Sequence, residues 1–262
     1  MSFRIASYNI FKGGKNVFDQ LAQAVSEIKA DCIGLLEANG WGENNEKILK
    51  NFAKLTHYPF SYFAKANTNY DIICLNNLKP KNSTYFKNNF WHTALINIFQ
   101  TNEIGEIAIV FIHFNPKTET ERVAEIKALI NILKPYPNAI ILGDFNSLSP
   151  HDQYNQNELL TALKNKNITK FGSDRILFET ITTIESAGFV DCAAHKNYFT
   201  NTVPTPANDD PFHAIPLRID YAFATPKIIP FIKNITVKKG GVFDKASDHF
   251  PLILDMDLTV EN

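Results

Sequence analysis

The sequence has few cysteines, almost no charge imbalance and no long apolar run, and each of these absences excludes a class of protein. Its 262 residues contain three cysteines, an odd number without a Cys-x-x-Cys spacing, which argues against a disulfide framework or a zinc site. No apolar run approaches the ~18 residues that a membrane-spanning helix needs. The 11 glycines and 13 prolines are too few for a collagen-like or low-complexity chain.

The charges nearly balance, with 26 Lys and Arg against 27 Asp and Glu and a net charge of -1. This balance does not indicate general binding of nucleic acid by positive charge, although it is compatible with a local basic groove. The first residues show no basic stretch followed by an apolar segment, and free cysteines are typical of a reducing compartment. We therefore expect a cytoplasmic protein without membrane insertion and without an evident protein partner.

Strand-like and helical segments alternate along the chain without a repeat or a linker, so we expect a single domain over residues 1–262. Apolar runs and period-two patterns predict strands, and apolar residues at helical spacing predict helices. The predicted strands span residues 4–10, 32–36, 71–75, 83–86, 93–99, 107–114, 139–145, 219–224, 235–238 and 252–258. The predicted helices span residues 17–29, 43–55, 120–133, 159–163 and 178–187. Many strands with few helices favour two sheets packed face to face with helices outside.

Residues 201–217 contain four prolines, which fix φ and remove backbone donors, so this stretch is predicted to be a long loop. Loops of this length in compact domains are usually functional or disordered, and the position before a polar strand start favours a function. His213 in this loop and His92 at a predicted strand start are candidates for substrate contact. A structural role is the alternative for each histidine.

Polar residues recur at the ends of the predicted apolar strands, where a polar side chain costs free energy unless it is paired. Each of them alone has an ordinary explanation as a turn or loop residue, but the set combines carboxylates, amides and histidines. Hard carboxylate and amide oxygens suit Mg²⁺ or Mn²⁺, and such a cation with carboxylates and histidines suits hydrolysis of phosphate esters. The set consists of Asn9, Glu37, His113, Asp144, Asn146, Asp220, Asp248 and His249.

In chain order, these segments resemble the endonuclease/exonuclease/phosphatase superfamily, also called deoxyribonuclease-I-like. The resemblance covers nearly the whole chain and implies an α/β fold, a four-layer α/β/β/α sandwich of two packed mixed sheets with the site at one edge. The matching segments are Ser7-Tyr8-Asn9-Ile10, Ile33-Gly34-Leu35-Leu36-Glu37, Ile112-His113-Phe114 with Arg122 one helix start later, Ile141-Leu142-Gly143-Asp144-Phe145-Asn146, Arg218-Ile219-Asp220-Tyr221-Ala222-Phe223 and Ser247-Asp248-His249.

The resemblance also implies roles for a metal ion and for water. Glu37 resembles the principal Mg²⁺ ligand, with Asp248 and Asn9 near the metal. Asp144 and Asn146 resemble the pair that orients or activates the attacking water. Because the two are two residues apart, an extended backbone would point both side chains to the same side.

The remaining roles concern histidines and the substrate. His249 resembles a histidine held by a carboxylate, here Asp220, which would fix its tautomer and favour a charged imidazole. His113 resembles the histidine that stabilises charge on phosphate oxygens. Arg122 is a further candidate for substrate contact. Asp71 is a candidate for orienting His113, but a solvated carboxylate at a strand start is the favoured interpretation.

The resulting hypothesis is a divalent-metal-dependent hydrolase of phosphoester bonds, with the phosphodiesterase or nuclease type favoured and nucleic acid among the candidate substrates. One alternative is a phosphomonoesterase that acts on a small phosphorylated metabolite or a lipid head group. Another is a catalytically silent scaffold, whose signature would be loss of Glu37, Asp144 or His249, and none of these is lost. The motifs of abasic-site nucleases, inositol-polyphosphate phosphatases and neutral sphingomyelinases are not matched.

Overall fold

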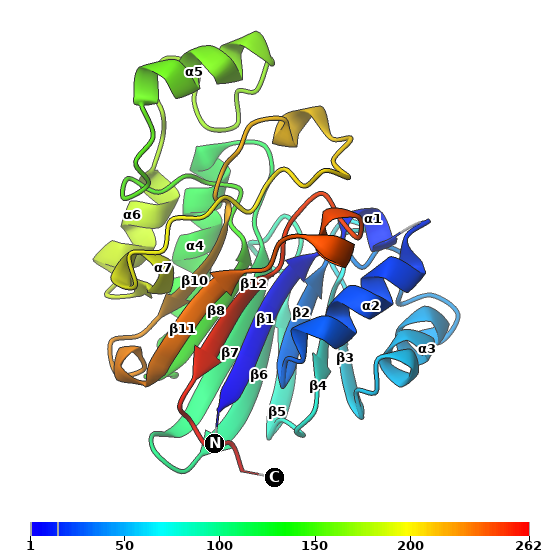
Figure 1. The fold of residues 1–262 in the computed structure, drawn as a ribbon. Helices are drawn as coiled ribbons and strands as arrows, with labels where there is room; N and C mark the ends of the chain where they lie inside the picture. Colours follow the sequence, from blue (N-terminus) through cyan, green and yellow to red (C-terminus); the bar gives the residue numbers. More distant parts are fainter. Residues whose placement is uncertain (1, 15, 262) are drawn as a thin grey trace.

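Two six-stranded sheets pack face to face in the computed structural model, which describes residues 2–14 and 16–261 (Figure 1). Both sheets are mixed, because β1 runs parallel to β2, and β7 runs parallel to β8, among otherwise antiparallel pairs. The α/β sandwich of two packed sheets that the resemblance implied is confirmed. The first sheet has the order β11 (Ile232–Val237), β12 (Leu252–Met256), β1 (Phe3–Asn9), β2 (Cys32–Leu36), β4 (Ile72–Asn76) and β3 (Phe60–Ala64). The second has the order β5 (Asn82–Phe86), β6 (Ala94–Thr101), β7 (Gly105–His113), β8 (Ala139–Asp144), β10 (Asp220–Ala224) and β9 (Val190–Asp191).

Helices flank the sheets on opposite sides, with α2 (Phe18–Ile28) and α3 (Lys47–Leu55) beside the first sheet and α4 (Glu119–Leu133) and α6 (Glu179–Ser186) beside the second (Figure 1). Thr118 caps α4 by accepting a hydrogen bond from the backbone N–H of Glu121, which satisfies a donor at the helix start. The remaining helices are α1 (Phe11–Gly14), α5 (Gln156–Asn165), α7 (Cys192–His195) and the 3₁₀ turns η1 (Pro211–His213), η2 (Ile229–Phe231) and η3 (Gly241–Asp244).

The apolar run of β7 shows how the layers form, because it is buried on both faces. Ile109 and Phe111 belong to the core cluster between the two sheets. Val110 and Ile112 belong to the cluster that includes Ile126 of α4. Successive side chains of a strand point to opposite faces, so a strand covered on both sides reads as a continuous apolar run.

One predicted helix begins later in the structure, and the edge strand β3 was not predicted. The helix predicted from residue 43 begins at Lys47, because Asn44, Asn45 and Glu46 have φ values of 50°, 57° and 60°, which lie in the left-handed region rather than the right-handed helical one. Strand β3 was not predicted, since its sequence Phe-Ser-Tyr-Phe-Ala does not alternate regularly between apolar and polar residues. It lies at the edge of the first sheet, and most of its side chains are half-buried.

The proline-rich segment 201–217 lacks regular strands, as predicted, and contains only η1 and an isolated bridge between Val203 and Leu217. Cys32 and Cys74 are buried core residues with their Sγ atoms 3.5 Å apart. Among residues 2–14 and 16–261, no helix combines the length and apolar character needed to cross a membrane.

Candidate active site

The polar residues at the strand ends meet at one edge of the packed sheets. Because β1 and β2 are parallel, Asn9 at the end of β1 lies beside Glu37, which follows β2. The parallel pair β7 and β8 brings His113 opposite Asp144. Strand β10 is antiparallel to β8, so its first residue, Asp220, also lies opposite Asp144.

Two contacts complete this arrangement across the sandwich. Strand β12 is antiparallel to β1, so the segment before it, which contains Asp248 and His249, reaches the same edge. There Ser247 Oγ donates a hydrogen bond to the Asn9 carbonyl oxygen over 2.7 Å. Asn9 Nδ2 lies 3.2 Å from Asp144 Oδ2 and so joins the first sheet to the second.

The Gly-Asp-Phe-Asn turn at the end of β8 needs its glycine. Gly143 has a φ of 151°, and a Cβ there would lie 1.8 Å from the carbonyl oxygen of Ile112 on β7. Only a residue without a side chain permits this close approach. Asn146 has a φ of 48°, and its backbone N–H donates to Asp144 Oδ1 over 2.8 Å, which fixes the carboxylate at the strand end.

Asp220, His249 and Asp144 lie in one row at the centre of the site. His249 Nδ1 is 2.8 Å from Asp220 Oδ2, and His249 Nε2 is 3.7 Å from Asp144 Oδ2. Burial opposes a charge on this fully buried imidazole, but the carboxylates, chiefly that of Asp220, raise the pKa of His249 to about 10. His249 is therefore a cation at neutral pH.

Asp144 stands between two histidines. His113 Nε2 lies 3.5 Å from the Oδ2 atom of Asp144, and His249 Nε2 lies 3.7 Å from the same atom. Burial alone would raise the pKa of Asp144, but the positive charge of His249, followed by the effect of His113, lowers it below the usual value. Asp144 is therefore an ionised carboxylate that can hold or deprotonate a water molecule.

His113 forms a ring stack with His92, with centroids 4.3 Å apart and an interplanar angle of 20°. Burial lowers the pKa of His113 to about 4, and Asp144 opposes the shift only in part. Burial also lowers the pKa of His92, to about 2, and its Nδ1 lies 2.6 Å from Thr68 Oγ1. Both rings are therefore neutral, and neither histidine supplies a positive charge to the site.

Asp71 takes neither of the roles considered from the sequence. It is almost completely buried rather than solvated. Its Oδ1 accepts from the backbone N–H of Ala66 over 2.8 Å, and its Oδ2 accepts from Lys65 Nζ over 3.1 Å. Asp71 therefore anchors the segment before β4. Its hydrogen bonds among the described residues go to Ala66 and Lys65, and none goes to His113.

Glu37 is held by two donors and is buried beside other carboxylates. It accepts from the backbone N–H of Lys12 at 2.9 Å and from Asn9 Nδ2 at 3.2 Å. Burial, with the nearby charge of Asp248, raises the pKa of Glu37 to about 7, although the Lys12 bond opposes the shift. Asn9 Oδ1 accepts from the N–H of Phe11, so Asn9 turns its amide nitrogen to the carboxylates.

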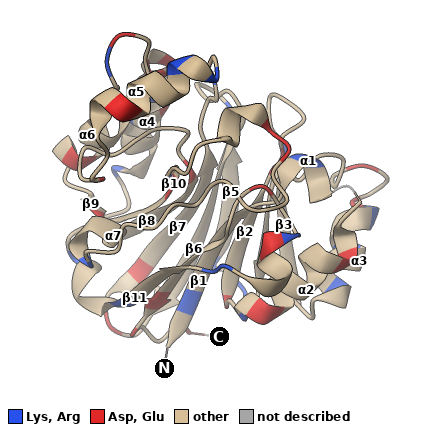
Figure 2. Ribbon diagram, turned by 45° about the horizontal axis from the view of Figure 1, so that its top comes forward, with Lys and Arg blue, Asp and Glu red and all other residues tan. Residues whose placement is uncertain are grey.

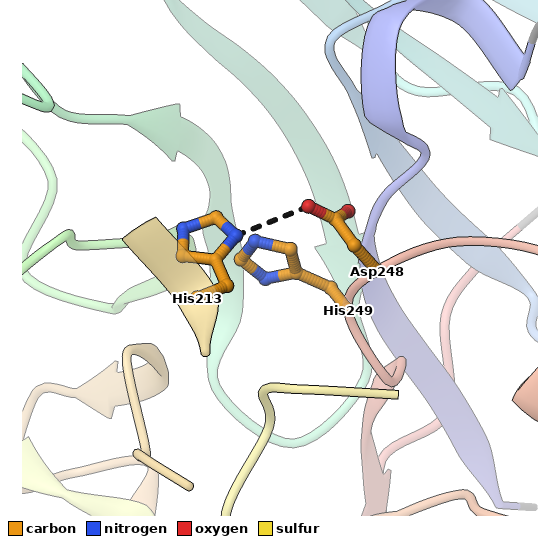
Figure 3. A group of neighbouring side chains, drawn as sticks. All are labelled: His213, Asp248 and His249. Carbon is orange, nitrogen blue, oxygen red and sulfur yellow. Dashed lines mark hydrogen bonds and ion pairs between the residues drawn. The ribbon is translucent and has the colours of Figure 1, made fainter. Parts of the chain in front are cut away.

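Asp248 and the proline-rich loop are joined by His213, as Figure 3 shows. His213 Nδ1 lies 3.0 Å from Asp248 Oδ2, and its ring meets that of His249 edge to face with centroids 4.7 Å apart. The predicted substrate-side histidine of the loop is therefore part of the site. His213, Asp248 and His249 form one cluster whose ligand atoms lie within 4.8 Å of one another, and Asp144, Asp220 and His249 form a second.

The sequence analysis missed Lys170, which lies in the irregular stretch between α5 and α6. Its side chain is buried, and Nζ donates to Asn146 Oδ1 over 2.8 Å and lies 3.3 Å from His213 Nε2. Burial lowers the pKa of Lys170 to about 8, with Asp144 opposing the shift. The local sequence has no pattern that distinguishes this lysine from its exposed neighbours Lys164 and Lys166.

Arg122 does not reach the substrate side as the sequence analysis expected. Its side chain is fully buried behind the site, where Nη1 donates to the carbonyl oxygen of Asn115 and Nη2 donates to that of Lys170. Glu119 accepts from Nε and Nη2 at 3.0 and 2.8 Å. Arg122 therefore holds the two segments that border the site and has no exposed surface for substrate.

A cavity of about 750 Å³ opens over these residues. Its wall includes Glu37, His92, His113, Asp144 and Asn146, together with Lys170 and His213, and further out lie aromatic side chains, Lys12, Lys117, Asp209 and Asp210. Lys and Arg are scattered over the fold with Asp and Glu between them (Figure 2). Three lysines, Lys12, Lys117 and Lys170, line this cavity.

The fold and the edge site together define the class. Two mixed sheets in a sandwich, with carboxylates, amides and histidines gathered at the ends of their central strands, are the arrangement of the endonuclease/exonuclease/phosphatase proteins. The family model described as "Endonuclease/Exonuclease/phosphatase family" matches residues 6–249, and the chain belongs to this family, as its motifs indicated. No curated protein matches the sequence.

Solved structures share the fold at low sequence identity. A 3′ phosphatase from Neisseria, bound to a product DNA hairpin, aligns with a TM-score of 0.72 and 13% identity, covering 97% of this chain and 99% of that one. An AP endonuclease from Archaeoglobus fulgidus gives 0.71 and 18%, with coverage of 97% and 99%. A family member from Bacteroides thetaiotaomicron gives 0.66 and 16%, with coverage of 100% and 99%.

Proposed function

We propose that this protein is a divalent-metal-dependent hydrolase of phosphoester bonds, of the phosphodiesterase or nuclease type, in which water attacks phosphorus in line with the leaving oxygen. The observation that carries the proposal is the Asp144 carboxylate in the cavity wall, with His113 Nε2 3.5 Å and His249 Nε2 3.7 Å from its Oδ2 atom. Such a group can orient or deprotonate water while donors on both sides stabilise negative charge on the phosphoryl oxygens.

His249 supplies the fixed positive charge in this proposal. Its Nδ1–H is held by Asp220, while Nε2 has no hydrogen-bond partner among the described residues. A buried donor without a partner carries a free-energy cost that a phosphoryl oxygen would remove. Asp220 acts through His249, because its carboxylate fixes the tautomer and keeps the imidazole charged.

The residues present fit a hard divalent cation. Glu37 is a buried carboxylate whose pKa is raised, and apart from His113 Nε2 at 3.9 Å the described residues give it no ion-pair partner. A cation would remove this penalty, and carboxylate oxygens are the ligands that Mg²⁺ and Mn²⁺ prefer. Glu37 would be the principal ligand, with Asp248 near the ion and Asn9 orienting Glu37 through its amide nitrogen. When bound, the cation would neutralise phosphate charge and stabilise the leaving oxygen.

Several features bear on the type of substrate. The Neisseria and Archaeoglobus proteins of the same fold are a 3′ phosphatase bound to DNA and an AP endonuclease, which supports a substrate of the nucleic-acid type. The cavity has a volume of about 750 Å³, and its wall includes the carboxylates of Asp209 and Asp210. This volume fits the alternative of a small phosphomonoester. A silent scaffold is disfavoured because six of the charged and hydrogen-bonding side chains of the site line one cavity, namely Glu37, His113, Asp144, Asn146, Lys170 and His213.

A hydrolysis panel tests the proposal. The purified protein, with Mg²⁺ or Mn²⁺ added, should be compared on bis(p-nitrophenyl) phosphate, p-nitrophenyl phosphate, plasmid DNA, RNA and sphingomyelin. We expect turnover of at least one substrate, loss of that turnover in Asp144→Asn, and no change in Asp19→Asn, a matched substitution at an exposed position of α2. Turnover of no substrate by folded, metal-supplied protein would refute the proposal.

A further inference from the structure

Lys170 is an ammonium group buried in the wall of the cavity without a counter-ion in contact. Its Nζ touches Asn146 Oδ1 and His213 Nε2, and no carboxylate oxygen of the described residues lies within 4.0 Å of it. Buried charges in proteins are normally paired, because removing a charge from water is costly. A lysine with a purely structural role would gain more from a carboxylate partner than from an amide and an imidazole.

We propose that Lys170 is a catalytic residue that binds a non-bridging oxygen of the phosphoryl group, and that His213 is the positioning residue that holds its ammonium. The inference rests on the proposed phosphoester hydrolysis and identifies a cation within that site. Lys170 keeps its proton throughout, so it adds an electrostatic contact and no proton-transfer step.

The hydrogen-bond inventory leaves Lys170 one free donor. An ammonium group has three N–H bonds, of which one meets Asn146 Oδ1 and one meets His213 Nε2. No further partner is present among the described residues, and the side chain lines the cavity. The third N–H is therefore available to an anion that enters the cavity, and a charge-assisted bond of this kind is stronger than a neutral one.

The tautomer of His213 follows from its other contact. Asp248 can only accept, so the proton of His213 lies on Nδ1, the atom 3.0 Å from Asp248 Oδ2 (Figure 3). Nε2 then carries a lone pair and accepts from the Lys170 ammonium. The backbone of His213 is held in η1, where its backbone N–H donates to the carbonyl oxygen of Asp210. The proline-rich loop thus positions the lysine from one side, and Arg122 fixes the Lys170 carbonyl from the other.

Lys170 also changes what Asn146 can do. Because Oδ1 accepts from Lys170 and one N–H of Nδ2 donates to the carbonyl oxygen of Phe114, the amide is held in one orientation. The cation beside it then presents the strongest donor on this side of the cavity. Negative charge that grows on the phosphoryl oxygens during hydrolysis would meet Lys170 in the cavity wall.

The test combines Lys170→Met and Lys170→Gln with Lys166→Met, a matched control at an exposed lysine of the same segment. Both Lys170 variants should lower kcat by about 10²- to 10³-fold, the usual effect of removing one donor to transition-state charge. They should also weaken competitive inhibition by inorganic phosphate at least ~10-fold. Lys166→Met should leave kcat and the inhibition by phosphate nearly unchanged. All of the variants should keep nearly the Tm of the wild-type protein. If either Lys170 variant keeps its fold, its kcat and its phosphate inhibition, the proposal is overturned.

His213→Asn tests the positioning role, because asparagine can still donate to Asp248 but offers Lys170 no ring nitrogen. We expect a smaller loss of kcat than for Lys170→Met, and no further loss when the two substitutions are combined, since both act through one contact. Additive losses would contradict the positioning role. Should wild-type protein hydrolyse nothing in the panel, phosphate binding still decides the matter: a phosphate-induced rise in Tm that persists in Lys170→Met would refute the lysine assignment separately.

Discussion

Asp220 Oδ2 lies 2.8 Å from His249 Nδ1, while the opposite ring nitrogen of His249 lies 3.7 Å from Asp144. This relationship sets the charge of His249, because the Asp220 carboxylate is the main reason that this buried imidazole stays protonated. The charge on His249 in turn helps to keep Asp144 ionised.

Asp220→Asn should therefore reduce activity without removing a group that touches the substrate. Losing the carboxylate lowers the pKa of His249 and releases its tautomer, and kcat should fall by about 10²- to 10⁴-fold, as in other carboxylate–histidine pairs. Steady-state kinetics with Asp19→Asn as the surface control measures the effect. An unchanged kcat in Asp220→Asn would show that this carboxylate does not tune His249.

The metal requirement should depend on Glu37. Chelation with EDTA should abolish hydrolysis, and Glu37→Gln should raise the Mg²⁺ concentration needed for half-maximal activity at least ~10-fold, because a neutral amide binds a hard cation less strongly than a carboxylate. Activity at a series of Mg²⁺ concentrations gives this value. An unchanged titration in Glu37→Gln would remove the residue from the set of ligands.

Activity should fall on the alkaline side as Lys170 loses its proton. Burial lowers the pKa of Lys170 to about 8, so the ammonium is charged below this pH and neutral above it. Lys170→Arg should lose this decline, because a guanidinium stays protonated to about pH 12; the same decline in its pH profile would contradict the assignment. The groups that face Lys170 are Asp144, Asp210, Asp248, Arg122 and His213.

Arg122 should matter for stability rather than for substrate binding. Arg122→Met leaves the Glu119 carboxylate buried without its cation, which should cost about 3–5 kcal/mol of unfolding free energy. Arg175→Met, which breaks an exposed pair with Glu179, should cost about 0–1 kcal/mol. Denaturant unfolding of both variants compares the two costs, and equal values would show that the buried network has no special role.

Most of the chemical groups of the site could be predicted because they stand at strand ends. A polar residue directly after an apolar run, as in Glu37 or Asp144, is visible in the sequence, and sheet topology brings such residues to one edge. The loops are different. Lys170 and His213 meet only because segments far apart in the chain fold over the same cavity. Neither the hydrophobic periodicity nor the residue spacing of the sequence predicts this contact.

The dependence on tertiary contacts also explains why the predictions for Arg122 and Asp71 were wrong. Arg122 has a charge that suits phosphate binding, but the buried carboxylate of Glu119 one helical turn away, together with two backbone carbonyls, takes its donors. Asp71 resembles a solvated strand start in sequence and is instead enclosed by Lys65 and the N–H of Ala66. Burial of a charged side chain depends on tertiary neighbours that a single sequence does not show.

In the proposed mechanism, water attacks phosphorus in a site organised around Asp144. The most direct test of this mechanism is hydrolysis of the best panel substrate in H₂¹⁸O with Mg²⁺ or Mn²⁺, followed by mass spectrometry of both products. We predict ¹⁸O in the phosphate-bearing product for the wild-type protein and no product above background for Asp144→Asn. The presence of ¹⁸O in the alcohol product, or turnover by Asp144→Asn equal to that of the wild-type protein, would refute this mechanism.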